Sequence, residues 1–315
     1  MQTLTANKVS TLVENIEKVI FGKREVVKLC VAGLLARGHI LIEDLPGMGK
    51  TTLAQGLARS IACTFNRIQF TSDMLPADIL GVSILSNRTE SFEFRSGPIF
   101  ANVVLADEIN RTPPKTQSAL LEAMSEFQVS VDGRTHMLPS PFIVLATQNP
   151  IEYEGTYTLP ESQLDRFMLR LTMGYPGAED ELHIMRRRDP KVALDNLQPV
   201  LSASDVLELQ ARVGEVTVDD SVARYILDIV QATRDDEHVQ LGASPRASVS
   251  FYEACQARAL TEGRDYVTPD DVKLMAQPVL SHRIIVKSRG GNPAASARER
   301  ARVLDDILRR VQIPV

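Results

Sequence analysis

A short glycine-containing segment between an apolar run and a helical pattern could hold a phosphate chain. Residues 40–52 read ILIEDLPGMGKTT, with Gly49, Lys50 and Thr51 at the start of the helical pattern. Glycines allow successive backbone N–H groups to face phosphate oxygens, a lysine supplies a point charge to the β- and γ-phosphates, and a hydroxyl can bind Mg²⁺. The segment therefore predicts a nucleotide-binding loop, with a plain glycine-rich turn as the alternative.

One position of this loop departs from the general pattern G-x-x-x-x-G-K-[ST]. Asp44 stands where the pattern has its first glycine, whereas the residues nearest to the phosphates retain turn-forming types. The departure weakens the match to the pattern but leaves the phosphate-binding chemistry in place. The candidate nucleotide-binding residues of the loop are Pro46, Gly47, Met48, Gly49, Lys50, Thr51 and Thr52.

Two carboxylates follow another apolar run. Residues 103–106 read VVLA and are followed directly by Asp107 and Glu108. The first carboxylate can hold Mg²⁺ together with Thr51, and the second can orient or deprotonate an attacking water. A solvated acidic strand end is the alternative. Because the phosphate loop precedes this pair in the same chain, the combination favours nucleotide hydrolysis.

Three further polar residues complete the candidate site. Asn149 follows the apolar run 143–147 and can hydrogen-bond a γ-phosphate or a water, Arg166 lies in the sequence LDRF, and Arg246 follows GASP at the start of a helical pattern. A guanidinium suits phosphate charge through its fork of donors, although a lone arginine is more often a solvated surface residue. The order of these residues after the loop and the carboxylates favours a functional role.

The elements that must position these residues form an α/β pattern in the first half of the chain. Short apolar runs alternate there with helical stretches, which predicts a parallel sheet covered by helices on both faces. These runs are 40–43, 68–70, 103–106, 143–147 and 168–171. Residues 82–94 and 127–142 interrupt the alternation, and each predicts a hairpin that projects from the sheet.

After residues 174–177 the strand patterns stop. Helical patterns follow at 179–188, 204–213, 219–234, 245–262 and 269–280, several of them preceded by a Ser, Thr or Asp cap. We therefore predict an α/β nucleotide-binding domain over residues 1–175 and an all-helical second domain over residues 176–315 that ends in a basic tail.

Composition excludes several classes of protein. The chain has 315 residues with 35 Lys and Arg against 40 Asp and Glu, so the net charge of −5 provides no overall attraction to nucleic acid or anionic membranes. No apolar run approaches the roughly 18 residues needed to span a bilayer. The three cysteines are far apart and the first residues resemble an amphipathic helix rather than a signal peptide, which indicates a cytoplasmic protein. The five histidines lack zinc-ligand spacing.

Together, these segments resemble those of an AAA+ ATPase. More narrowly, LIEDLPGMGKTTLA, FTSDMLPADILG, FEFRSGPIFANVVLADEINR, ATQNP, LPESQLDRF and GASPRAS resemble the MoxR family over about residues 20–286. The resemblance implies a three-layer α/β nucleotide domain with sheet order 5-1-4-3-2, hairpins at the two interrupted segments, and a helical lid domain.

The same resemblance assigns roles to individual residues. Lys50 and Thr51 match the Walker A pair, and Asp107 and Glu108 match the Walker B pair. Asn149 matches sensor 1, Arg166 matches the arginine finger that acts on the nucleotide of a neighbouring subunit, Arg246 matches sensor 2, and Ile20 and Gly22 lie in the segment that packs around adenine. Asp44 is also frequent in the family, so it does not indicate inactivation.

In this family, a hexameric ring couples hydrolysis of Mg²⁺-bound ATP to the remodelling of client proteins, often in the assembly of metal-containing enzymes. A partner with a von Willebrand factor A domain is also common in the family. The alternatives are a nucleic-acid-associated AAA+ motor and a nucleotide switch that does not hydrolyse ATP. The net charge of −5, the 5% aromatic content and the absence of Trp disfavour the motor. The presence of Glu108 and Arg166 disfavours the switch.

Overall fold

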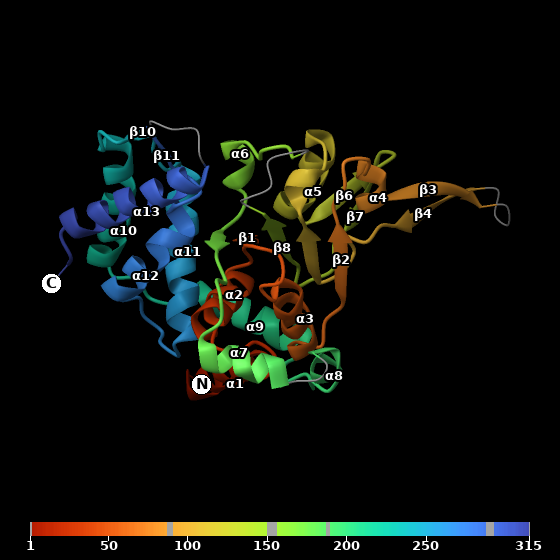
Figure 1. Ribbon diagram of the computed structural model, residues 1–315, viewed down its shortest axis with the longest axis horizontal. Coiled ribbons are helices and arrows are strands. Elements are labelled where there is room, and N and C mark those ends of the chain that lie inside the picture. The colour runs from red at the N-terminus through yellow and green to blue at the C-terminus, as the bar shows by residue number, and fades with distance from the viewer. Residues whose placement is uncertain (1, 87–90, 150–155, 187–189, 288–292, 315) are drawn as a thin grey trace.

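A five-stranded parallel sheet lies at the centre of the nucleotide domain. The computed structural model describes residues 2–86, 91–149, 156–186, 190–287 and 293–314 (Figure 1). The strands are β1 (Ile40–Glu43), β2 (Phe65–Gln69), β5 (Val103–Asp107), β8 (Ile143–Gln148) and β9 (Leu169–Leu171). Their spatial order is β2-β5-β8-β1-β9 and every neighbouring pair is parallel. Counted along the chain and read from β9, this is the predicted order 5-1-4-3-2, which is confirmed.

The central strands are apolar up to their last one or two residues because both faces of the sheet are covered. All five residues of β5 are buried, and successive residues enter two different cores. Val103 and Leu105 pack in one core with residues of α1 (Gln2–Glu17), α2 (Arg24–Leu35) and α3 (Lys50–Ser60). Val104 and Ala106 pack in the other core with residues of α4 (Pro76–Leu80) and α5 (Pro114–Glu126). This alternation produces the three-layer arrangement.

Antiparallel hairpins occupy both interrupted segments. One consists of β3 (Gly81–Ser86) and β4 (Ser91–Ser96), and its turn at 87–90 lies outside the described residues. The other consists of β6 (Gln128–Val131) and β7 (Arg134–Met137). Figure 1 shows β3 and β4 extending away from the central sheet. The rings of Phe94 and His136 stack with centroids 3.8 Å apart, so the two hairpins contact each other.

The second half of the chain is helical, with one small addition. Its helices are α7 (Ala178–Arg186), α8 (Pro190–Asp195), α9 (Ala203–Val213), α10 (Asp220–Asp235), α11 (Pro245–Thr261), α12 (Pro269–Leu280) and α13 (Pro293–Arg310). Capping side chains of Ser202, Asp219, Ser244 and Thr268 accept backbone N–H groups at four helix starts. The addition is an antiparallel ribbon of β10 (Val239–Leu241) and β11 (Ile285–Val286), so the expectation of helices alone was too simple.

The helical half packs closely against the N-terminal helices. Helices α8 and α9 contact α3 and α2, and the side chain of Gln210 donates to the backbone carbonyl of Leu34 at 2.7 Å. Helices α10 to α13 gather at the side of the molecule opposite to the hairpin β3–β4 (Figure 1). The domain boundary at residues 175 and 176 therefore coincides with no break in packing, and it stays a prediction.

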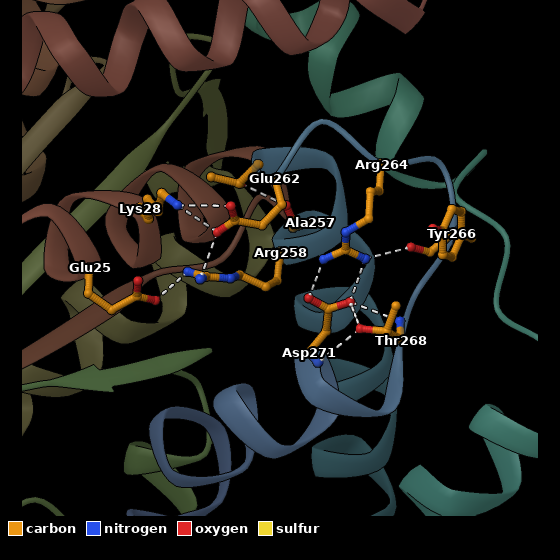
Figure 2. A network of polar contacts seen from close by, with 10 residues as sticks. Glu25, Lys28, Ala257, Arg258, Glu262, Arg264, Tyr266, Thr268 and Asp271 are labelled. Atoms are coloured by element: carbon orange, nitrogen blue, oxygen red, sulfur yellow. Dashed lines mark hydrogen bonds and ion pairs between the residues drawn. The ribbon is translucent and has the colours of Figure 1, made fainter. Parts of the chain in front are cut away.

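Helix α11 is fastened to α2 by charged side chains (Figure 2). Lys28 Nζ lies 2.8 Å from both carboxylate oxygens of Glu262, and Arg258 pairs with Glu25 and Glu262. Arg258 is only 4% exposed, so its charge requires these partners. This contact connects the lid to the core that contains residues of α1, α2 and α3.

Among the described helices, none has the length and apolar character required to cross a membrane.

Candidate functional site

The phosphate loop connects β1 to α3, and two of its residues have backbone conformations that favour glycine. Gly47 and Gly49 have φ angles of 84° and 88°, in the left-handed region. Helix α3 begins directly afterwards at Lys50. The first N–H groups of a helix have no acceptor inside it, and they carry the positive end of the helix dipole. The loop therefore fits a chain of phosphates.

The ammonium group of Lys50 lies over the start of this loop. Its Nζ donates to the carbonyl oxygens of Asp44 at 2.7 Å and Leu45 at 3.1 Å. Burial lowers the pKa of Lys50, whereas the nearby charges of Asp107, Asp44 and Glu108 raise it. The ammonium group is thus held at the loop and lies near enough to both carboxylates to be influenced by their charges, so it can meet a phosphate there.

Asp44 fastens the loop to the chain segment after β9. Its side chain is 7% exposed, Oδ1 accepts the N–H of Leu45 at 2.8 Å, and Oδ2 accepts the N–H of Gly174 at 2.7 Å. A glycine at position 44 would have no side chain to make either contact. The departure from the general loop pattern therefore has a structural purpose in this chain.

The carboxylate pair lies at the carboxyl end of β5, beside the end of β8. Thr147 Oγ1 donates to Asp107 Oδ1 at 2.6 Å and accepts the backbone N–H of Glu108 at 2.9 Å. Glu108 has a φ of 59°, an uncommon left-handed conformation for a residue with a side chain. Thr147 therefore holds the carboxylate of Asp107 and the backbone of Glu108.

Three further residues contact the pair, and the sequence interpretation did not include them. Arg67 Nη2 and Nε donate to Asp107 Oδ2 at 2.5 and 3.1 Å, and Gln69 Nε2 donates to Glu108 Oε2 at 2.8 Å. Arg111 Nε forms an ion pair with the same Glu108 oxygen at 3.0 Å. Arg67 and Gln69 alternate on β2, which is adjacent to β5. Their spacing of two residues, which puts both side chains on one face of a strand, was visible in the sequence. It could be interpreted only once β2 was known to lie beside β5.

Asn149 lies close to these groups because of the strand order. It is 8% exposed and directly follows β8, which lies between β5 and β1. The backbone carbonyl of Gln148 accepts the N–H of Asp44 at 3.2 Å, so the end of β8 contacts the phosphate loop. This arrangement places Asn149 between the loop and the carboxylates.

The segment matched to adenine contacts α7. The side chain of Ile20 is buried, and its Cδ1 lies 3.8 Å from where a Cβ on Gly49 would be. Gly22 has a φ of 65°, and a Cβ there would lie 1.9 Å from Asp180 Oδ2. The rings of Phe21 and His183 stack with centroids 6.2 Å apart. Asp180 and His183 therefore border this segment, and no motif in the sequence pointed to them.

The two arginines of the candidate site lie outside this group of contacts. Arg166 follows α6 (Glu161–Leu164), and its Nη1 donates to the carbonyl of Leu121 at 2.7 Å and to Ser125 Oγ at 3.1 Å, both on α5. Arg246 is exposed in the first turn of α11. The structure of a single chain therefore attaches Arg166 to α5 and presents Arg246 on the lid.

Models of two families match the chain. The model described as "ATPase family associated with various cellular activities (AAA)" matches residues 39–169, and the "AAA lid domain" matches residues 231–310. The first range contains the phosphate loop, the carboxylate pair, Asn149 and Arg166. The second contains Arg246.

Relatives match over most of the chain. The protein YeaC of Bacillus subtilis is 50% identical over 96% of this chain and 94% of its own length. The protein named "Chaperone MoxR1" of Mycobacterium tuberculosis is 44% identical over 86% of this chain and 74% of its own length. A crystal structure of a proposed ATPase from Cytophaga hutchinsonii is 39% identical, covers 100% of this chain and 97% of that chain, and superposes with a TM-score of 0.88.

Proposed function

Since this chain belongs to the MoxR family of AAA+ ATPases and is an ATP-hydrolysing enzyme, we propose that it couples hydrolysis of Mg²⁺-bound ATP to the remodelling or assembly of protein complexes. The observation that carries the proposal is the position of Lys50, whose ammonium group contacts the carbonyls at the start of the loop and is influenced by the charges of Asp107 and Glu108. This position supports a role for Lys50 as the phosphate-binding cation, beside a candidate metal ligand and a candidate base.

The loop and the carboxylates fit the nucleotide and the metal. Lys50 and the N–H groups at the start of α3 would hold the phosphates, while residues 20–22 would border the adenine. Thr51 and Asp107 offer a hydroxyl and a carboxylate, the oxygen ligands that Mg²⁺ prefers. When bound, ATP supplies the phosphoryl group that is transferred to water, and Mg²⁺ neutralises charge on its oxygens.

Glu108 is the residue that we assign to the water. Its carboxylate would orient the attacking water and accept its proton. Gln69 and Arg111 hold Oε2, and Thr147 holds the backbone N–H, so these neighbours set the orientation of the base. Asn149 would hydrogen-bond the γ-phosphate or the water. In the same scheme, Arg246 would contact the nucleotide of its own subunit through movement of the lid.

We assign Arg166 to the nucleotide of a neighbouring subunit. In the single chain its guanidinium contacts α5, which supports a role outside the chain's own site. This assignment requires an oligomer, and a hexameric ring is the form we propose. The clients would be proteins, a protein with a von Willebrand factor A domain would be a partner, and the oligomer would work in the cytoplasm.

A substitution at Glu108 tests the assignment of the base. Glu108→Gln keeps the shape of the side chain but cannot accept a proton, so ATP binding should persist while hydrolysis falls by about 10²- to 10⁴-fold. Glu122→Gln, at an exposed position on α5, is the matched control and should keep the parental rate. Hydrolysis at the parental rate by Glu108→Gln would show that another group activates the water.

Mixed oligomers test the role of Arg166. We call the Glu108→Gln subunit the finger donor, because it retains Arg166, and the Arg166→Ala subunit the finger acceptor, because it retains Glu108. Each should be nearly inactive alone. Mixing them creates interfaces with an intact site and an intact finger, so partial recovery of ATP hydrolysis is expected. Demonstrated co-assembly without recovery would exclude action on the neighbouring site.

A further inference from the structure

The chain segment that carries Arg166 is held by the lid on both sides of that residue. Before Arg166, the carboxylate of Asp165 pairs with Arg283, with Oδ1 and Nε 2.9 Å apart. After Arg166, the carbonyl oxygen of Phe167 accepts Nη2 of Arg283 at 2.9 Å and lies 2.8 Å from Nε2 of His282. Arg283 and His282 come from the segment that follows α12.

Arg283 is buried at this junction. Its side chain is 2% exposed, and burial lowers its pKa to about 10, which the charge of Asp165 opposes. Its Nη1 also donates to the carbonyl of Val279 at 3.2 Å, on α12. This buried guanidinium has acceptors both on α12 and on the segment of Arg166. If either of them moved away from the other, Arg283 would lose buried hydrogen bonds. The contact between α12 and the Arg166 segment therefore opposes movement of one relative to the other.

Asp165 is connected to the start of α11 as well. Ser244 Oγ donates to Asp165 Oδ2 at 3.1 Å and accepts the N–H of Ala247 at 3.1 Å as the N-terminal cap of the helix. Arg246 lies two residues after this cap. One carboxylate therefore joins the helix start that bears Arg246 to the residue that precedes Arg166.

We propose that Asp165, Arg283 and Ser244 are positioning residues that couple the lid of a subunit to its own Arg166. This inference rests on the proposed roles of Arg246 and Arg166. Nucleotide contacts that move Arg246 would move Ser244 and Arg283 with the lid, and these would shift the backbone on both sides of Arg166. The state of a subunit's own site would thereby set how well it completes the neighbouring site.

The mixed oligomers provide an asymmetric test. Arg283→Gln is placed either in the finger donor, whose Arg166 is used, or in the finger acceptor, whose Arg166 has already been removed. We expect it to lower ATP hydrolysis by the mixture on the order of tenfold or more in the donor, because small misplacements of a reacting group are costly. In the acceptor the same substitution should cost much less. Equal losses in both arrangements, or no loss in the donor, would overturn the proposal.

A second substitution decides the question if Arg283→Gln subunits fail to assemble. Ser244→Asp retains a good helix cap but cannot donate a hydrogen bond, and its charge faces that of Asp165. Ser244→Thr retains both the cap and the donor and is the matched control. Ser244→Asp in the donor should lower the activity of the mixture severalfold, while Ser244→Thr should keep it. Equal activities of the two variants would overturn the coupling.

The failure of this inference can be distinguished from the failure of the proposed function. If donor and acceptor subunits without further substitutions show no recovery, the role of Arg166 on the neighbouring site is wrong. If they recover activity and Arg283→Gln lowers it by the same factor in either subunit, only the coupling is wrong. Nucleotide binding by each subunit, measured with a fluorescent ATP analogue, shows whether the substitution has damaged its own site.

Discussion

Asp44 and Gly174 are 130 residues apart in the sequence, yet the carboxylate of the first accepts the backbone N–H of the second at 2.7 Å. Gly174 follows β9 and precedes α7, so this hydrogen bond joins the phosphate loop to the connection between the sheet and the helical half. A movement of that connection can therefore reach the phosphate loop directly.

The first prediction concerns this contact. Asp44→Gly restores the general loop pattern but removes two hydrogen bonds to a buried carboxylate, so we expect a loss of about 2–4 kcal/mol in the free energy of unfolding and weaker ATP binding. Chemical denaturation and nucleotide titration measure the two effects. Asp78→Ala, which removes a similar bond to the N–H of Leu75 at an exposed helix start, should leave ATP binding unchanged. Tighter ATP binding by Asp44→Gly would show that the carboxylate hinders the loop.

The second prediction concerns Lys50. Lys50→Ala removes the cation at the phosphate loop, and a hydrogen bond to a charged group contributes about 1.5–3 kcal/mol, so ATP affinity should fall roughly 10- to 100-fold. Isothermal titration at fixed Mg²⁺ measures the affinity. Lys273→Ala, whose side chain is 37% exposed and pairs with Asp270 on the lid, is the control. Unchanged affinity in Lys50→Ala would remove this residue from the phosphate site.

Much of the sheet could be predicted from the sequence because its central strands are buried on both faces. The strands β1, β5 and β8 are apolar up to their last one or two residues, and polar residues begin at the carboxyl end of each strand. Strand β2 was placed less accurately, at 68–70 instead of Phe65–Gln69. As an edge strand with polar residues, it shows no continuous apolar run. The strand order itself came from the family resemblance.

The contacts that depend on the strand order could not be predicted in the same way. Arg67 and Gln69 meet Asp107 and Glu108 only because β2 lies beside β5. The ribbon of β10 and β11 was missed because strands of three and two residues are too short for any periodicity. The bond from Ser244 to Asp165 joins residues that are 79 positions apart, and nothing in the local sequence indicates it.

The third prediction concerns the pH dependence of stability and rests on His39. This side chain is 4% exposed, its Nδ1 accepts the N–H of Val144 at 3.0 Å, and its Nε2 therefore donates to the carbonyl of Met124 at 2.9 Å. Burial lowers the pKa of His39 from 6.5 to about 4. Between pH 6.5 and about 4 the unfolded chain binds a proton at His39 more readily than the folded chain does. The free energy of unfolding therefore decreases as the pH falls through this range.

The full effect of His39 is about 3 kcal/mol, because one pKa unit corresponds to about 1.4 kcal/mol. Urea midpoints of the parent protein at pH 7, 5.5 and 4.5 should therefore fall more steeply than those of His39→Gln, which keeps one donor and one acceptor. His282, whose pKa burial also lowers, should leave part of the slope in that variant. His238→Gln, at a position 68% exposed, is the control. Parallel slopes for the parent and His39→Gln would contradict the prediction.

The last prediction concerns the basic tail and the alternative function as a nucleic-acid motor. Residues 282–310 contain eight Lys or Arg against three acidic residues, and 288–292 lie outside the described part of the chain. Helix α13 uses Val303, Leu304 and Ile307 to pack on the lid, while Arg310 pairs with Asp236 and Arg309 lies 3.6 Å from Asp306. Packing and acidic neighbours thus account for the helix without a nucleic-acid partner.

We therefore expect this tail to give no nucleic-acid binding of functional strength. Binding that depends on phosphate contacts loses about 10³- to 10⁵-fold in affinity between 50 and 200 mM salt when six to ten contacts are involved. A mobility-shift titration with single- and double-stranded DNA, with and without ATP, should show at most retention at low salt that disappears at physiological salt. Arg309→Gln, which removes an exposed charge without touching the packed face, should reduce that low-salt retention. Tight retention at physiological salt that responds to ATP would instead support the alternative function as a nucleic-acid motor, because binding through phosphate contacts alone is weakened by salt at that concentration.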